Sequence, residues 1–473
     1  MSADELCWTP ARELARMIRA TEVSPVEVVD AVLERMGWVN PRINAYCTLT
    51  ADLALESARA AEVAAARGDS LGPLHGVPFS LKDLTPTRGI RTTMGSKIFE
   101  HNVPAEDAVL VERLREAGGI LLGKTNTPEF GCKPFTDNLI FGTTRNPWSL
   151  DRSPGGSSGG AAAAVAAGLG PLAEGSDLAA SIRQPAAWCG VVGFKPCQGR
   201  IARYPSQTGW NAMSMNGPIT RTVGDAALMF SAMVGPDPRD PLALPHTGEN
   251  WARLADEPSI RGMRAAWTPD LGGAAAVDPA IAKTCEAAAK TFGDLGCELE
   301  EASPEVGNIT DPFLVLNAGL RQATLGKYLA EWRDQMDPIL VKRLEVSLEC
   351  SAADVGRADV ERTAHHQRLS RFFERFDLLV LPTTATAARP LDALLPAEIA
   401  GRPITQHLDM LIPTFAFNLS AYPAISVPCG WTDDGLPVGL QIVAGWHQDA
   451  RVLQAAACFE AARPWAARRP VLE

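Results

Sequence analysis

Residues 154–160 read Pro-Gly-Gly-Ser-Ser-Gly-Gly and lead directly into an alanine-rich apolar stretch that ends near Ala167. Glycine adopts backbone conformations that are closed to other residues, and it lets a second group approach the main chain closely. A flexible Gly/Ser linker is a weak alternative, because a linker would not be followed at once by a dense apolar helix. The pattern therefore predicts a constrained loop that presents serine hydroxyls at the start of a buried helix.

Short apolar runs alternate with helical stretches through residues 72–235. The strand-like runs are residues 76–81, 120–122 and 190–194, and the helical stretches include 107–117 and 159–167. Further strand-like runs follow from residue 376, at 378–381, 424–427 and 438–443. Such alternation predicts an α/β fold in which helices cover the faces of a sheet. Length alone suggests two or three domains, but no linker or internal repeat divides the chain.

Residues 10–67 read as helices. Ser24, Pro25 and Glu27 form a start signal, with serine at the N-cap, proline at the first position and glutamate at the third. We expect this helix to break at Asn40–Pro41, and a second helix to cover residues 51–67.

Composition excludes several classes of function. The net charge of −11 disfavours nucleic acid and anionic membranes as partners. No apolar run approaches the length of a membrane span, and we expect no secretory signal because residues 1–10 lack an apolar core. The ten cysteines form no C-x-x-C pair and match no zinc spacing, so we expect reduced thiols, no metal and a cytoplasmic location.

Residues 175–186 hold a second serine-containing loop. Ser181 is flanked by small residues, which leaves it open to a substrate carbonyl and lets backbone N–H groups converge on one point. Asp177 and Arg183 are placed to pair across the loop and hold it. Taken alone, this segment also fits an ordinary turn.

Lys82 ends the apolar run 76–81. A lysine in this position usually extends its amine to solvent. If it were buried, its pKa would fall and the neutral amine would act as a base near pH 7.

Residues 118–125 satisfy the phosphate-binding pattern G-x-x-x-x-G-K-T. Ile120, Leu121 and Leu122 read as a buried strand rather than an open loop, and Pro128 prevents a helix from continuing through the motif. Nucleotide binding is therefore disfavoured. No G-x-S-x-G elbow occurs, although a histidine-based triad stays open because its members can come from anywhere in the chain.

Taken in order, these segments resemble the amidase signature family. The matching blocks are residues 72–83, 118–131, 144–160, 175–196, 217–229 and 417–443. The resemblance implies one large α/β/α domain with a mixed central β-sheet flanked by helices. Its parts would be N-terminal helices (1–70), a signature core (72–235), a variable specificity region (236–370) and a C-terminal return to the core sheet (376–473).

The resemblance also implies a mechanism. Ser181 matches the nucleophile, Ser157 the relay serine that follows a cis peptide bond, and Lys82 the base. The products would be an acid and ammonia or an amine, formed through an acyl-enzyme without metal or cofactor. The implied oxyanion hole is the backbone of Leu178, Ala179, Ala180 and Ser181, and the implied supporting residues are Gly155, Gly156, Ser158, Asp177 and Arg183.

The family usually has Thr-Gly-Gly where this chain has Leu178-Ala179-Ala180, and alanine would be strained if position 180 required a positive φ.

Two alternatives stay open: the glutaminase component of a tRNA-dependent amidotransferase, known as its A subunit, and a catalytically silent scaffold. For the former, Arg321 and Arg389 are candidates to bind the glutamine carboxylate. Segments 236–370 and 385–415 are expected to line the pocket. Four aromatic residues are candidates for the lining, although core packing is the commoner use of such rings: Trp188, Trp210, Phe313 and Phe415. A small-molecule amide is the expected partner, and base rates favour a homodimer.

Overall fold

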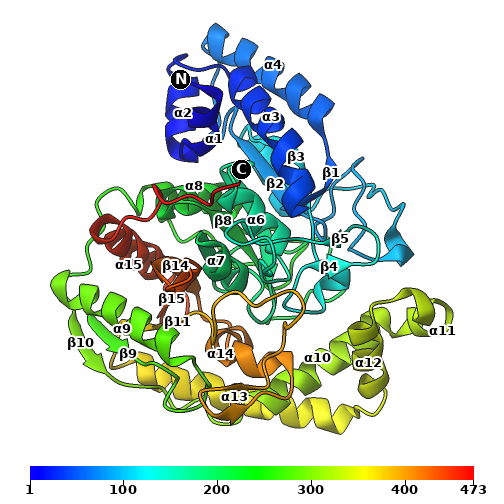
Figure 1. Cartoon of the computed structure of the whole chain (residues 1–473), viewed down its shortest axis with the longest axis vertical. Coiled ribbons are helices and arrows are strands. Elements are labelled where there is room, and N and C mark those ends of the chain that lie inside the picture. Colours follow the sequence, from blue (N-terminus) through cyan, green and yellow to red (C-terminus); the bar gives the residue numbers. More distant parts are fainter. Residues whose placement is uncertain (473) are drawn as a thin grey trace.

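Strands from both ends of the chain meet in one eleven-stranded sheet in the computed structural model, which describes residues 1–472 (Figure 1). In the order in which they lie side by side, the strands are β1 (Tyr46–Leu49), β3 (Ile120–Thr125), β2 (Pro78–Lys82), β6 (Leu172–Asp177), β8 (Met215–Thr220), β7 (Val192–Lys195), β14 (Ala424–Trp431), β15 (Pro437–Ala444), β11 (Leu378–Pro382), β9 (Arg264–Trp267) and β10 (Glu298–Glu301). Strand β2 runs parallel to both neighbours, whereas β14 and β15 are antiparallel. The expected mixed sheet is confirmed.

Helices surround this sheet. They are α1 (Ala3–Trp8), α2 (Ala11–Arg19), α3 (Pro25–Ile43), α4 (Ala51–Arg67), α5 (Val109–Glu116), α6 (Gly159–Ala166), α7 (Arg183–Cys189), α8 (Val223–Met233), α9 (Pro279–Asp294), α10 (Thr310–Leu325), α11 (Leu329–Trp332), α12 (Pro338–Ser347), α13 (Ala352–Phe373), α14 (Ile412–Leu419) and α15 (Asp449–Ala462). Helices α1–α4 lie at one end of the molecule and α10–α13 at the other (Figure 1).

Short elements complete the chain. The 3-10 helices are η1 (Lys97–Phe99), η2 (Glu129–Gly131), η3 (Trp251–Arg253), η4 (Gly326–Tyr328), η5 (Arg333–Gln335) and η6 (His407–Leu411). Two small hairpins pair β4 (Asp137–Asn138) with β5 (Gly142–Thr143) and β12 (Glu398–Ile399) with β13 (Arg402–Pro403). No helix within residues 1–472 is both long and apolar enough to cross a bilayer.

Both faces of the sheet are buried, as strand β11 shows. Leu378 and Val380 belong to the core cluster that includes α9 and α15, whereas Leu379 and Leu381 belong to the cluster that includes α13 and α14. Successive side chains of a strand point to opposite faces, so an uninterrupted apolar strand requires helices on both sides. This arrangement gives the three layers expected of an α/β/α domain.

Helix α3 begins where the sequence predicts. The Ser24 side chain accepts from the Val26 amide at 2.9 Å, and the Ser24 amide donates to Glu27 at 2.8 Å. The predicted break at Asn40–Pro41 is wrong, because α3 continues to Ile43. Pro41 lies in the last turn, where its missing N–H removes only one helical hydrogen bond near an end that would fray anyway.

The G-x-x-x-x-G-K-T segment forms the buried strand β3 rather than a phosphate loop. Lys124 is fully buried and donates to the Thr87 hydroxyl at 2.8 Å. A side chain at Gly123 would lie 2.2 Å from the Thr48 carbonyl oxygen of β1. The lysine and glycine of the motif therefore serve packing within the sheet.

Candidate active site

Lys82 stands at the end of β2 with its side chain inside the protein. The residue is 0% exposed, and its Nζ donates to Ser157 Oγ at 2.7 Å. A second hydroxyl, Ser176 Oγ, lies 3.1 Å from the same amine. Its strand lies between β3 and β6, and the side chain is buried instead of extending to solvent as such a lysine usually does.

The buried environment alters the chemistry of this amine. Burial lowers the pKa of Lys82 from its ordinary 10.5 to about 7, although the negative charges of Glu174 and Asp177 act in the opposite direction. A substantial fraction is therefore neutral at pH 7 and can accept a proton from a bound hydroxyl.

The Gly/Ser loop fixes the position of Ser157. The Gly156–Ser157 peptide bond is cis, and Gly155 has a φ of +82°. A side chain at Gly156 would lie 2.7 Å from the Phe135 backbone nitrogen, so only glycine fits there. The amide of Ser158 donates to the Ser181 carbonyl oxygen at 3.1 Å, which ties the two serine loops together. Helix α6 begins immediately afterwards, at Gly159.

Ser181 lies in the turn between β6 and α7 and is partly exposed. It lines a cavity of about 380 Å³ together with Ser157 and Ser176. Ser181 also lines a second cavity of about 450 Å³ with Leu178 and Ala179. The structure therefore brings Lys82, Ser157 and Ser181 to one site.

Backbone donors are available beside Ser181. Within residues 1–472, the amides of Leu178, Ala179, Ala180 and Ser181 donate no hydrogen bond to another protein group. Unpaired N–H groups next to a hydroxyl are the arrangement that stabilises an oxyanion.

Asp177 and Arg183 form a buried ion pair beneath this turn. Arg183 Nη2 lies 3.0 Å from Asp177 Oδ1, and both side chains are 0% exposed. The carboxylate also accepts from the Ile182 amide at 3.0 Å. Burial alone would raise the pKa of Asp177, but the charge and hydrogen bonds of Arg183 outweigh it and hold this pKa at about 2. The pair stays ionised and holds both ends of the turn.

Ala179 and Ala180, which stand where the family usually has two glycines, do not strain the backbone. Ala180 is absent from the positive-φ non-glycine residues in the described chain. Its side chain is 1% exposed and packs in the cluster that includes Phe415. Alanine at this position therefore adds a packing contact without a conformational cost.

Several polar residues of the site escaped the sequence analysis. Glu174 accepts from the Lys82 amide at 3.1 Å and from Asn216 at 2.7 Å. Asn418 donates to Asp177 Oδ1 at 2.9 Å, and Gln441 accepts from Arg183 at 2.7 Å. Ser176 belongs to the second serine loop and Glu174 lies three residues before Asp177, so both carried a weak signal. Asn418 and Gln441 lie in the matching block 417–443, but nothing in that block pointed to Arg183, because only the fold brings α14 and β15 to it.

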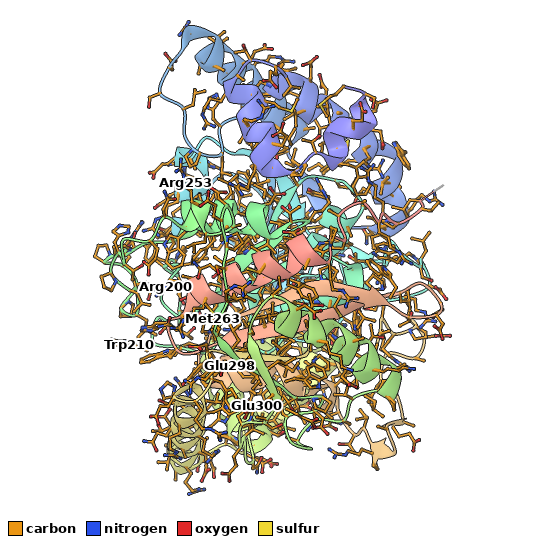
Figure 2. All side chains as sticks on the ribbon, turned by 90° about the vertical axis from the view of Figure 1, so that its left-hand side faces the viewer. Arg200, Trp210, Arg253, Met263, Glu298 and Glu300 are labelled. Atoms are coloured by element: carbon orange, nitrogen blue, oxygen red, sulfur yellow. The ribbon has the colours of Figure 1, made fainter. Side chains whose placement is uncertain are left out.

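Of the four candidate aromatics, Phe313 alone lines one of these cavities. Phe415 is buried behind it at 4.9 Å between ring centroids, and Trp188 is buried with its indole bound to the Thr386 carbonyl oxygen. Trp210 is 78% exposed and lies at the edge of the molecule (Figure 2). Large aromatic rings more often fill the core than a pocket.

The two arginines that were candidates to bind a glutamine carboxylate lie in different parts of the structure. Arg321 lines both cavities. Arg389 lines neither of them and donates to the Ala393 carbonyl oxygen at 3.0 Å.

Comparisons with known proteins match the sequence and the fold of this chain to one family. A family model described as Amidase matches residues 27–453. An acylamidase from Rhodococcus erythropolis is 42% identical over 475 residues, covering 99% of this chain and 98% of that protein. The A subunit of glutamyl-tRNA(Gln) amidotransferase from Moorella thermoacetica is 38% identical, covering 99% of both. The crystal structure of a bacterial aryl acylamidase of the amidase signature family superposes with a TM-score of 0.91 at 31% identity, covering 98% of this chain and 99% of that one.

Proposed function

The chain belongs to the amidase signature family, and on that premise we propose that it cleaves a carboxylic amide with Ser181 as nucleophile, Ser157 as relay and Lys82 as base. The products are an acid and ammonia or an amine. The observation that carries the proposal is the 2.7 Å contact between the buried Lys82 amine and the Ser157 hydroxyl. An amine whose pKa lies near 7 serves this role at neutral pH.

The proposed mechanism moves one proton along three groups. Neutral Lys82 takes the Ser157 proton while Ser157 takes that of Ser181, and Ser181 Oγ attacks the amide carbon. The free amides of residues 178–181 stabilise the oxyanion. The proton returns through Ser157 to the leaving nitrogen, the C–N bond breaks, and water then hydrolyses the Ser181 ester.

One alternative has support of its own. The 38% identity to the glutamyl-tRNA(Gln) amidotransferase component favours glutamine hydrolysis with ammonia passed to a partner. Glutamine carries an α-ammonium group, however, and the described residues that line the two cavities include no aspartate or glutamate to pair with it. The intact Lys82–Ser157 contact also favours catalysis over a silent scaffold.

The test is loss of activity in Ser181→Ala. We expect no release of aniline or ammonia from a panel of acyl anilides and primary amides, and no labelling by a fluorophosphonate probe. Ser149→Ala is the matched control, because Ser149 is bonded to Asp151 and lines neither cavity. This variant should retain both amide hydrolysis and probe labelling. The melting temperatures should agree. Full activity in Ser181→Ala would contradict the proposal.

A further inference from the structure

The two cavities at Ser181 carry positive charge only. Four cationic side chains line the larger cavity, namely Lys133, Arg321, Lys342 and Arg343. The smaller one has Arg203 and Arg321. Neither set of described lining residues holds a carboxylate, in a chain whose net charge is −11. Such a lining attracts an anionic ligand against the charge of the whole protein.

Most of these cations already have partners. Lys133 lies 2.7 Å from Asp137 and is also paired with Asp337. Arg343 donates to the Cys132 carbonyl oxygen. Arg321 differs from both, because its guanidinium forms no hydrogen bond or ion pair with another protein group within residues 1–472. Burial and the charge of Arg343 lower the pKa of Arg321 only to about 10, so it remains cationic at neutral pH.

Asn317 stands one helical turn before Arg321 on α10. Side chains four residues apart on a helix lie on the same face. Both residues line both cavities, and both cavities include Ser181. Asn317 is 4% exposed, and its Nδ2 has no hydrogen-bond partner. A buried amide donor left unpaired costs free energy unless a ligand accepts from it.

From this geometry we propose that Asn317 and Arg321 bind a carboxylate carried by the amide substrate, so that amides bearing a second, ionised carboxyl group are preferred over neutral amides of the same length. This inference rests on the proposed amidase function of Ser181. A guanidinium and an amide N–H together supply donors for both oxygens of a carboxylate. The absence of lining aspartate or glutamate further favours an acid without an adjacent ammonium, so glutaramate should exceed glutamine as substrate.

The kinetic test compares pairs of amides in which a methyl group replaces the carboxylate. Glutaramate is compared with pentanamide, and N-butyrylglycine with N-butyrylethylamine, so that a preference in one pair also tells which side of the amide carries the carboxylate. We expect kcat/KM to favour the acid in at least one pair by about 10- to 100-fold. Equal kcat/KM within both pairs overturns the proposal.

Variants assign that preference to the two residues. Arg321→Gln should reduce the acid-to-neutral ratio about 10-fold or more, and Arg321→Lys should restore part of it. Asn317→Asp, which keeps the shape and adds a negative charge, should reduce the ratio as well. Arg389→Gln removes an arginine outside both cavities and should leave the ratio unchanged. An unchanged ratio in folded Arg321→Gln contradicts the assignment.

A binding measurement separates this proposal from the assignment of the nucleophile. Glutaramate and N-butyrylglycine are titrated by calorimetry into Ser181→Ala, alone and combined with Arg321→Gln. Binding of either acid that is lost in the double variant supports the carboxylate site even if Ser181 is not the nucleophile. If Ser181→Ala binds neither acid more tightly than its neutral counterpart, the site is overturned whatever the kinetics of the nucleophile.

Discussion

Replacing Glu174 with glutamine should move the acid limb of the pH–rate profile to lower pH. The Glu174 carboxylate raises the pKa of Lys82 against the effect of burial. Its Oε2 lies 3.1 Å from the Lys82 backbone nitrogen, and a lysine side chain places Nζ about 6 Å from that nitrogen, so we take the charges to be about 7 Å apart. With an effective dielectric constant of about 20, Coulomb's law gives about 2 kcal/mol, or about 1.5 to 2 pH units.

The sign follows from which form of the amine is active. The proposed base is neutral Lys82, so kcat/KM should fall as pH drops through its pKa of about 7. Removing the nearby negative charge disfavours the protonated amine, and Glu174→Gln should therefore retain activity at lower pH. Glutamine fits, because its amide nitrogen can face Asn216, whose own amide can turn over to accept.

The assay is kcat/KM for one neutral amide from about pH 4 to pH 9, which reports the free enzyme. Glu298→Gln, which removes an exposed carboxylate on the edge strand β10, is the control and should leave the midpoint in place (Figure 2). A Glu174→Gln midpoint equal to that of the wild type, or shifted upward, would refute the reasoning.

Two further predictions concern the turn that carries Ser181. Arg183→Met leaves the buried Asp177 carboxylate without its ion-pair partner and should lower the free energy of unfolding by about 3–5 kcal/mol, measured by urea denaturation; a loss below about 1 kcal/mol would show that the pair does not hold the turn. Ala180→Gly should lower the free energy of unfolding by about 1 kcal/mol, because a buried methyl group is lost and the unfolded chain gains freedom. A gain in stability would mean that Ala180 is strained after all.

Prediction from the sequence was most accurate for segments whose residue pattern fits only one kind of local structure. The Gly/Ser loop and the apolar runs of β2, β3 and β7 needed no tertiary context beyond their own pattern. Strand β6 was missed, because its central residues include Glu174 and Ser176, which read as a loop. These polar groups are tolerated in a buried strand only because Lys82, Asn216 and their neighbours satisfy them.

The functional residues of the variable region (236–370) could not be predicted from a local pattern in the same way. An asparagine on a helix of mixed composition, such as Asn317, is indistinguishable from a surface residue until the fold places α10 over Ser181. The size of Trp210 made it a candidate to line the pocket, but the loop that carries it faces solvent. The roles of Lys82, Ser157 and Ser181 stay predictions, although the structure brings their side chains to one site.

Because Ser181 borders both cavities, an ester formed on it is open from two directions. An acyl group that fills one compartment leaves the other available to any small nucleophile. Under the proposed mechanism, added amines or hydroxylamine compete with water for the same carbonyl carbon, and the partition follows their relative concentrations. If the proposed ester forms, the second opening would therefore allow transacylation as well as hydrolysis.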